Sequence, residues 1–211
     1  MYQSKHKLKV MFIEDDLTPA ALFNLPSEYK ITVDKYWSGE TSPRGRRFCA
    51  ALFWSPSYFY ASFNASISEP LVLSEYPVRD SKTLGLWERD VFEIFIAPNP
   101  ERFNHYFEFE VAPTGEFVDL RLETTSQNRI MDVEYESGME VAAEIAESVS
   151  AAMKIPWKAF GKKPVRGEVW RGNILRAMGK GNNRGYLAWQ PTETAVPNFH
   201  MPEKFGGIEF S

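Results

Sequence analysis

Short runs of alternating hydrophobic and polar residues, separated by Pro, Gly, Ser and Asn, dominate this chain. Such runs at close spacing are typical of antiparallel sheets built from many short strands, and sequences with helical periodicity are scarce. The pattern predicts an all-β fold, an antiparallel β-sandwich of the immunoglobulin or jelly-roll kind with few short helices. The 211 residues suit a single domain, residues 1–211, in which we expect 1–24 to form an irregular N-terminal extension.

Most of the expected strands form hairpins. Composition alone would allow a helix in the Ala-rich stretch 139–148, but the alternation that continues through 150–156 favours a hairpin there. Residues 66–86 and 179–185 are expected to be loops, with short helical turns at 19–22 and 157–160. The predicted strands are 30–33, 47–54 with 58–65, 90–97, 106–112 with 116–123, 139–147 with 149–156, 169–178, 186–190 and a short one at the C-terminal end.

The strand predicted at 90–97 has an acid on a half-buried face. Phe92, Ile94 and Ile96 share one face, and Glu93 lies on the other between apolar neighbours. A buried carboxylate without a partner is costly, so we expect Glu93 to have a partner.

The hairpin at 106–122 has one apolar and one polar face. Glu108 and Glu110 share the polar face with Tyr106. A register that keeps the polar faces together places Glu108 opposite Asp119 and diagonal to Arg121, within reach of a charge-assisted bond. This face either meets solvent or, on a concave sheet, offers acceptors to the hydroxyls of a sugar.

Two tryptophans lie beside predicted strands, where a rigid aromatic surface can bind a ligand. Trp87 precedes the strand at 90–97, and Trp189 is followed by Gln190. An indole ring can stack on the C–H face of a sugar while neighbouring polar groups bond its hydroxyls. Structural packing is the alternative for both, and it is the interpretation we prefer for the other tryptophans, Trp37, Trp54, Trp157 and Trp170.

Charge and cysteine content exclude several classes of partner and site. The net charge of −4 gives no field that attracts nucleic acid or an anionic membrane, so we expect neither partner. Cys49 is the single cysteine, which excludes a disulfide framework and a Cys-based zinc site. Because the first residues lack an apolar signal-peptide core, we expect a cytoplasmic location, or export if a leader has been removed.

Several acids also allow a hydrolase interpretation, with Asp90, Glu93, Glu108 and Glu110 as candidates, although the separation of the carboxylates decides that chemistry. There is no Gly-x-Ser-x-Gly motif, and the three histidines have no metal-ligand spacing. The glycine-rich loop 179–185 lacks the ending of a phosphate-binding loop. No cofactor is expected, while a structural calcium ion is compatible with loop acids and carbonyls.

Taken together, several motifs resemble carbohydrate-binding modules of family 9, in their bacterial, xylanase-associated branch. The resemblance covers nearly the whole chain from about Leu25 and rests on the order and spacing of four stretches: 86–98 (LWERDVFEIFIAP), 105–115 (HYFEFEVAPTG), 118–121 (VDLR) and 189–191 (WQP) with 197–206 (PNFHMPEKFG).

The resemblance implies a β-sandwich without catalysis of its own, in which Trp87 and Trp189 sandwich a terminal sugar of a xylan or cellulose chain and Glu93 bonds its hydroxyls. This chain has Glu108 and Glu110 where sugar-binding members tend to have basic or amide side chains, and Tyr186 where a polar residue is expected.

We therefore predict non-catalytic binding of a mono- or oligosaccharide. The alternatives are a glycoside hydrolase, or an accessory domain of one, and a haem-binding sandwich domain with Met178, Lys180, His200 and Met201 as candidate ligands. The predicted ligand-binding residues are Trp87, Glu93, Glu108, Glu110, Arg121, Trp189 and Gln190.

Overall fold

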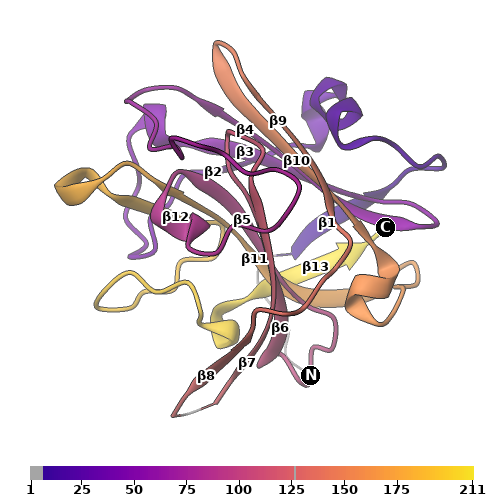
Figure 1. Ribbon diagram of the computed structural model, residues 1–211. Helices are drawn as coiled ribbons and strands as arrows, with labels where there is room; N and C mark the ends of the chain where they lie inside the picture. Colours follow the sequence, from indigo (N-terminus) through magenta and orange to yellow (C-terminus); the bar gives the residue numbers. More distant parts are fainter. Residues whose placement is uncertain (1–6, 126) are drawn as a thin grey trace.

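The computed structural model describes residues 7–125 and 127–211, and in this part of the chain strands are the main element (Figure 1). Apart from short 3-10 helices, no helix is present in these residues, as the alternating pattern predicts. The strands are β1 (Lys7–Phe12), β2 (Ile31–Val33), β3 (Phe48–Trp54), β4 (Tyr58–Ser66), β5 (Val91–Ala97), β6 (His105–Val111), β7 (Phe117–Thr124), β8 (Arg129–Asp132), β9 (Glu140–Ile145), β10 (Ser148–Pro156), β11 (Val169–Met178), β12 (Gly185–Ala188) and β13 (Gly206–Phe210).

The strands form two layers that share β1. One layer has the order β8-β7-β6-β5-β11-β13, with β12 beside β11, and the other has the order β3-β4-β10-β9, with β2 beside β3. The first part of β1 pairs in parallel with β13, and its last two residues pair in parallel with β3. The prediction that residues 1–24 are irregular is therefore wrong for Lys7–Phe12, a strand that joins the two layers. Strand β8 has no counterpart among the predicted strands.

The Ala-rich stretch is a hairpin, as predicted. Its strands, β9 and β10, pair antiparallel, with Ala151 opposite Ala143 and Met153 opposite Val141. The predicted hairpins β3–β4 and β6–β7 also form.

The main core lies between the layers. Phe92, Ile94 and Ile96 of β5 face this core, as their alternation predicts, and pack with apolar residues of β3, β4 and β10. Trp54, Trp157 and Trp170 are buried in it, and their rings contact Phe210. Burying this aromatic surface favours folding by roughly 25 cal/mol for each Å² removed from water.

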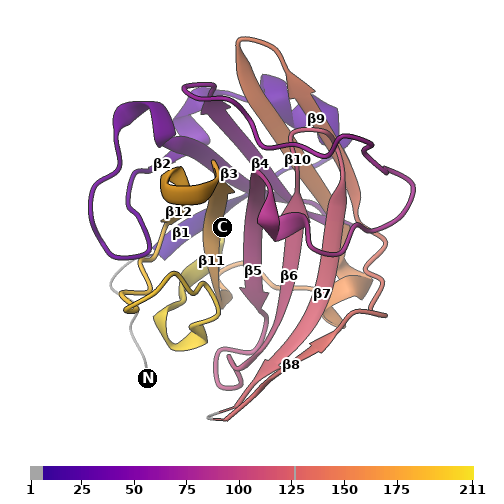
Figure 2. The same cartoon turned by 60° about the vertical axis from the view of Figure 1, so that its left-hand side comes forward.

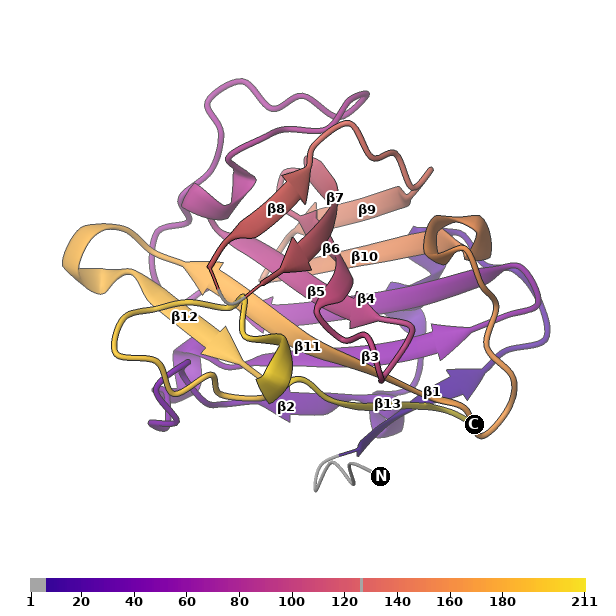
Figure 3. The same ribbon diagram turned by 90° about the horizontal axis from the view of Figure 1, so that it is seen from below.

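A second apolar cluster covers the outer face of the first layer, the face turned away from the core. It joins residues of β5, β6, β7 and β11 to side chains from two connecting segments, among them Leu86 and Phe205. Figure 2 shows β11, β5, β6 and β7 side by side, and Figure 3, from below, shows the C-terminal segment in yellow passing beside β11 and β12. The candidate functional site lies on this outer face.

The predicted register of the β6–β7 hairpin is wrong by one residue. Glu108 is opposite Leu120, and Asp119 is opposite Phe109. The turn sets this register, because the amide of Ala112 donates to the carbonyl of Glu116 and that of Gly115 donates to Ala112. A one-residue shift moves the side chains of β7 to the opposite faces, so the acids of β6 share their face with apolar residues of β7.

The shift gives Asp119 and Arg121 different partners from those predicted. Asp119 is buried, lies 2.8 Å from the ammonium of Lys82 and accepts a hydrogen bond from the amide of Ser137. Arg121 is largely exposed and bonds Asp132, with 2.6 Å between Nη2 and Oδ2. The predicted bond between Arg121 and Glu108 is therefore wrong.

Candidate functional site

A cleft of about 440 Å³ opens on the outer face of the first layer. Its floor includes Glu93 of β5, Glu108 of β6 and Ala177 of β11, and aromatic side chains stand along its walls. The volume lies within the usual range for small-molecule sites, about 300–1,000 Å³.

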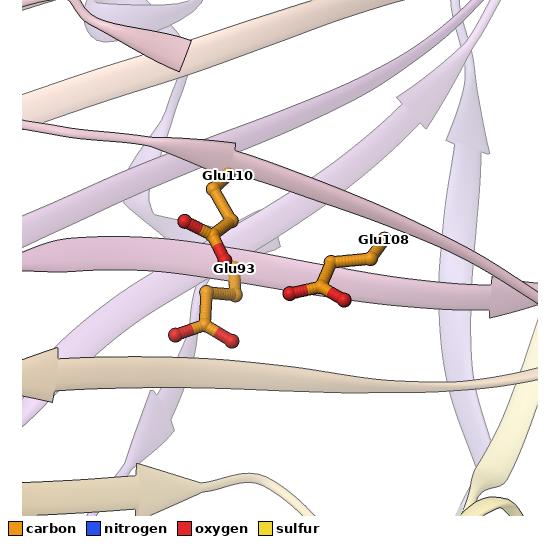
Figure 4. Close-up of side chains that lie close together, drawn as sticks. All are labelled: Glu93, Glu108 and Glu110. Atoms are coloured by element: carbon orange, nitrogen blue, oxygen red, sulfur yellow. The ribbon is translucent and has the colours of Figure 1, made fainter. Parts of the chain in front are cut away.

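The acids of the floor gather because of strand register. Glu93 is directly opposite Glu110 in the β5–β6 pair, and Glu108 lies two residues along β6 on the same face. One carboxyl oxygen from each of the three lies within 4.8 Å of those of the other two, and Figure 4 shows the three carboxyl groups close together. Glu93 and Glu108 line the cleft, whereas Glu110, on the same face of β6 as Glu108, is fully buried and does not line it.

Burial and mutual repulsion govern the ionisation of this cluster. Burial raises the pKa of Glu93 well above its usual range, and the charge of Glu108 adds to the effect. Burial also raises the pKa of Glu110 well above its usual range, together with the charges of its two neighbours. The pKa of Glu108 is raised by burial. Three carboxylates this close do not ionise together without a compensating positive charge.

Trp87 stands at the side of the cleft on a rigid turn. It lies in the 3-10 helix η4 (Leu86–Glu88), anchored by the fully buried Leu86. Arg184 fixes this turn to the start of β12, because its Nη2 donates to the carbonyls of Trp87 at 2.5 Å and Arg89 at 2.9 Å. Its Nη1 donates to the carbonyl of Gly179.

Tyr186 supplies a second aromatic side chain in the lining of the cleft. Its ring meets those of Trp37 and Phe199 edge-on, with centroids 6.1 and 5.7 Å away. The guanidinium of Arg184 lies 5.3 Å from the centre of the same ring. Arg184 therefore connects both aromatic side chains, Trp87 through its backbone and Tyr186 through its ring.

The segment before β13 contributes a histidine to the cleft. His200 Nδ1 lies 2.9 Å from the hydroxyl of Tyr106, and its ring lies 5.0 Å from that of Phe95. Burial lowers the pKa of His200 to about 3, and the positive charge of Arg129, which also lines the cleft, acts in the same direction. His200 is thus neutral near neutral pH and can accept or donate hydrogen bonds there.

The structure brings four of the predicted site residues together: Trp87, Glu93, Glu108 and Glu110. It does not bring the other three to this cleft. Trp189 packs against the main core, and its ring lies directly over Gly206. The backbone amide and carbonyl of Gln190 bond the side chain of Asn173. Arg121 contributes to a separate depression beside His105.

The candidates for the alternative chemistries are also dispersed. Asp90 is not among the residues lining the cleft, and its Oδ1 accepts a hydrogen bond from the amide of Gly179. Met178 is buried in the core between the layers, whereas His200 lies on the outer face. These two candidate haem ligands are therefore on opposite faces of the first layer.

Sequence reasoning did not assign Tyr186, Phe199, Asn198, His200 and Arg129 to the site, although all five line the cleft. Tyr186 was visible as a departure from the motif near Trp189. The others come from irregular segments or from β8, for which the alternating pattern gives no signal.

The fold is that of carbohydrate-binding modules of family 9. A protein of Bacteroides uniformis ATCC 8492 that is proposed to bind carbohydrate superposes with a TM-score of 0.76 at 18% identity, over 97% of this chain and 99% of that one. A family 9 module of Caldicellulosiruptor kristjanssonii, solved with glucose, gives a TM-score of 0.65 at 13% identity, over 98% and 96% of the two chains. The structure of that module with cellotriose gives the same TM-score and identity, over 98% of this chain and 94% of that one.

No protein-family model matches the sequence, and no curated protein matches it. The similarity is therefore one of structure. Among the described residues, no helix has the length and apolar character needed to cross a membrane.

Proposed function

We propose that this chain is a non-catalytic carbohydrate-binding domain whose ligand is a sugar at the end of a glycan chain of cellulose or xylan type. The observation that supports this most is the position of Trp87 at the side of a cleft whose floor is acidic, on a fold shared with modules solved with glucose and cellotriose.

The cleft offers both kinds of contact that a pyranose needs. Aromatic faces pack against sugar C–H groups, and here Trp87 and Tyr186 are the aromatic side chains available. Sugar hydroxyls need hydrogen-bond partners, and Glu93, Glu108 and His200 supply them from the floor and side. The proposal thus pairs Trp87 with Tyr186 in place of Trp189.

The experiment is calorimetric titration with glucose, cellotriose, xylose and xylobiose, and with the matching alditols. Trp87→Ala should weaken binding about thirtyfold or more, because a buried aromatic anchor is worth about 2 kcal/mol. Tyr186→Ala should also weaken it, and Trp189→Leu should leave it within about threefold of wild type. Loss of affinity with the alditols alone would identify the reducing end as the part bound.

Three results would contradict the proposal, each in a different way. If Trp189→Leu lost affinity and Tyr186→Ala kept it, the sandwich of two tryptophans would replace the arrangement proposed here. Reducing ends released from cellulose or xylan by wild-type protein, and not by Glu93→Gln, would establish a hydrolase. Absence of binding to every glycan would reject the proposed function.

A further inference from the structure

The floor of the cleft gathers three buried acids with no ion-pair partner beside them in the described part of the chain. Glu93, Glu108 and Glu110 are at most 3% exposed, and among the described residues no ion pair reaches any of them. The guanidinium of Arg184 influences Glu93, but its described hydrogen bonds go to backbone carbonyls. Buried charges of one sign without a counter-charge are strongly unfavourable.

The buried carboxyl group of Glu110 provides a second observation that points to a bound ligand. Its side chain is fully buried, and its carboxyl oxygens meet no donor in the described structure other than the neighbouring acid Glu108, with which it can bond only when one of the two carboxyls is protonated. Glu108 Oε2 likewise meets no other donor among the described residues. Buried carboxyl oxygens almost always have partners in native proteins, so these oxygens point to a group that is bound between them.

The donor set favours a hard divalent cation. All three donors are carboxylates, and no cysteine or histidine belongs to the group. Calcium binds oxygens at about 2.3–2.6 Å, so oxygens on opposite sides of one ion are roughly 4.6–5.2 Å apart. The separations of up to 4.8 Å between the acids therefore allow one calcium-sized ion to reach all three.

The cluster is buried at one end and reaches the cleft at the other. Glu110 is fully buried, while Glu93 and Glu108 line the cleft together with Trp87. Calcium takes about six to eight oxygen ligands, and three carboxylates supply three to six of them. The remaining positions of such an ion would face the cleft, where a ligand stacked on Trp87 presents its hydroxyls.

We propose that Glu93, Glu108 and Glu110 bind one divalent cation of the calcium class at the floor of the cleft, and that this cation coordinates neighbouring hydroxyls of the sugar. The coordination of the sugar rests on the proposed function, whereas the binding of the cation does not. Recognition of the sugar is then cation-dependent, with the aromatic side chains contributing stacking.

The test begins with protein treated with EDTA and then dialysed free of chelator. Terbium is titrated in while Trp87 and its neighbours are excited, and calcium is then added as competitor. We expect saturable sensitised emission with one ion per chain, displaced by calcium. Glu110→Gln, which removes one ligand charge and no cleft-lining residue, should weaken calcium binding at least tenfold. Glu144→Gln, an exposed acid on β9, is the matched control and should bind as wild type.

Glucose and cellotriose titrations with and without calcium separate the two proposals. Binding of sugar that is lost in EDTA and restored by calcium would confirm both. Equal sugar binding in EDTA, with no bound ion, would overturn the cation site and leave the proposed function intact. Ion binding without any sugar binding would support the cation site and overturn the proposed function. If metal-free protein bound glucosamine and not glucose, the acids would be binding the ammonium group of an amino sugar, and the cation site would be overturned.

Thermal unfolding keeps the test decisive if a variant folds poorly. Calcium should raise the melting temperature of wild type and of Glu144→Gln, and should leave that of Glu110→Gln unchanged. An equal rise in all three proteins would show that calcium binds elsewhere and would overturn the site.

Discussion

Glu93 of β5 and Glu110 of β6 are direct cross-strand partners, so two acids face each other across neighbouring strands inside the protein. Like charges in this arrangement destabilise a sheet pair. The partners of the two acids on the outer strands are apolar, since Leu175 of β11 is opposite Glu93 and Val118 of β7 is opposite Glu110, and Arg184 is the positive charge that acts on both acids. The cation site proposed above would remove the cost of this pairing, because a bound cation would balance the charges of the facing acids.

Arg184 should act as a positioning residue for the aromatic side chains. Arg184→Met removes the hydrogen bonds that hold the turn of Trp87, so we expect sugar affinity to fall about tenfold, with both rings still present. Calorimetric titration with cellotriose measures the effect. Arg79→Met, which removes an arginine bonded to the carbonyl of Thr114 on another loop, is the control.

A second variant separates geometry from charge at this position. Arg184→Lys keeps the positive charge but cannot form the same set of hydrogen bonds. Affinity equal to wild type in Arg184→Lys would show that charge near Glu93, and not the position of Trp87, is what Arg184 contributes.

Gly206 should be required for the packing of Trp189. A Cβ at this position would lie 2.5 Å from Trp189 Cη2 and 2.7 Å from Cζ3. We expect Gly206→Ala to lower the free energy of unfolding by about 1–3 kcal/mol, as overpacking does. Denaturant titration measures this, and the sugar affinity of the folded variant should stay within about threefold of wild type. A large loss of affinity at unchanged stability would instead place Trp189 in the binding site.

His200 should make the protein less stable as the pH falls. Its pKa in the folded state is about 3, against 6.5 for an unperturbed histidine. Between these values the unfolded state binds a proton that the folded state does not, so the free energy of unfolding decreases as pH falls from about 6.5 toward 3. The decrease is at most about 1.4 kcal/mol for each pH unit.

Two histidine variants test this assignment. Melting temperatures between pH 7 and pH 4 should fall less steeply for His200→Gln than for wild type. His105→Gln, at a partly exposed histidine 3.4 Å from Glu123, is the control for replacing a histidine by glutamine. Parallel curves for wild type and His200→Gln would show that the acid sensitivity arises from other groups.

Most of the fold follows from the alternating pattern, because each strand buries one face. The faces of β5 and β6 were predictable from the period of two, including the side on which Glu93, Glu108 and Glu110 lie. The Ala-rich β9 was also predictable, since its alternation continues into β10. Strand β1 could not be predicted from its own residues. It forms because it pairs with β13, at the other end of the chain, and with β3, beyond the first loop.

The sequence by itself determined that the chain is a β-sandwich, and it placed Trp87 and the acids of β5 and β6 in a candidate site. Only the tertiary structure decided which of these residues meet. The register of β5 against β6 places Glu93 opposite Glu110, the register of β6 against β7 removes Arg121, and the packing of Trp189 over Gly206 leaves Tyr186 beside the cleft. The physical reason is that residue types and their period define the faces of a strand, whereas turns and packing between distant segments define its partners.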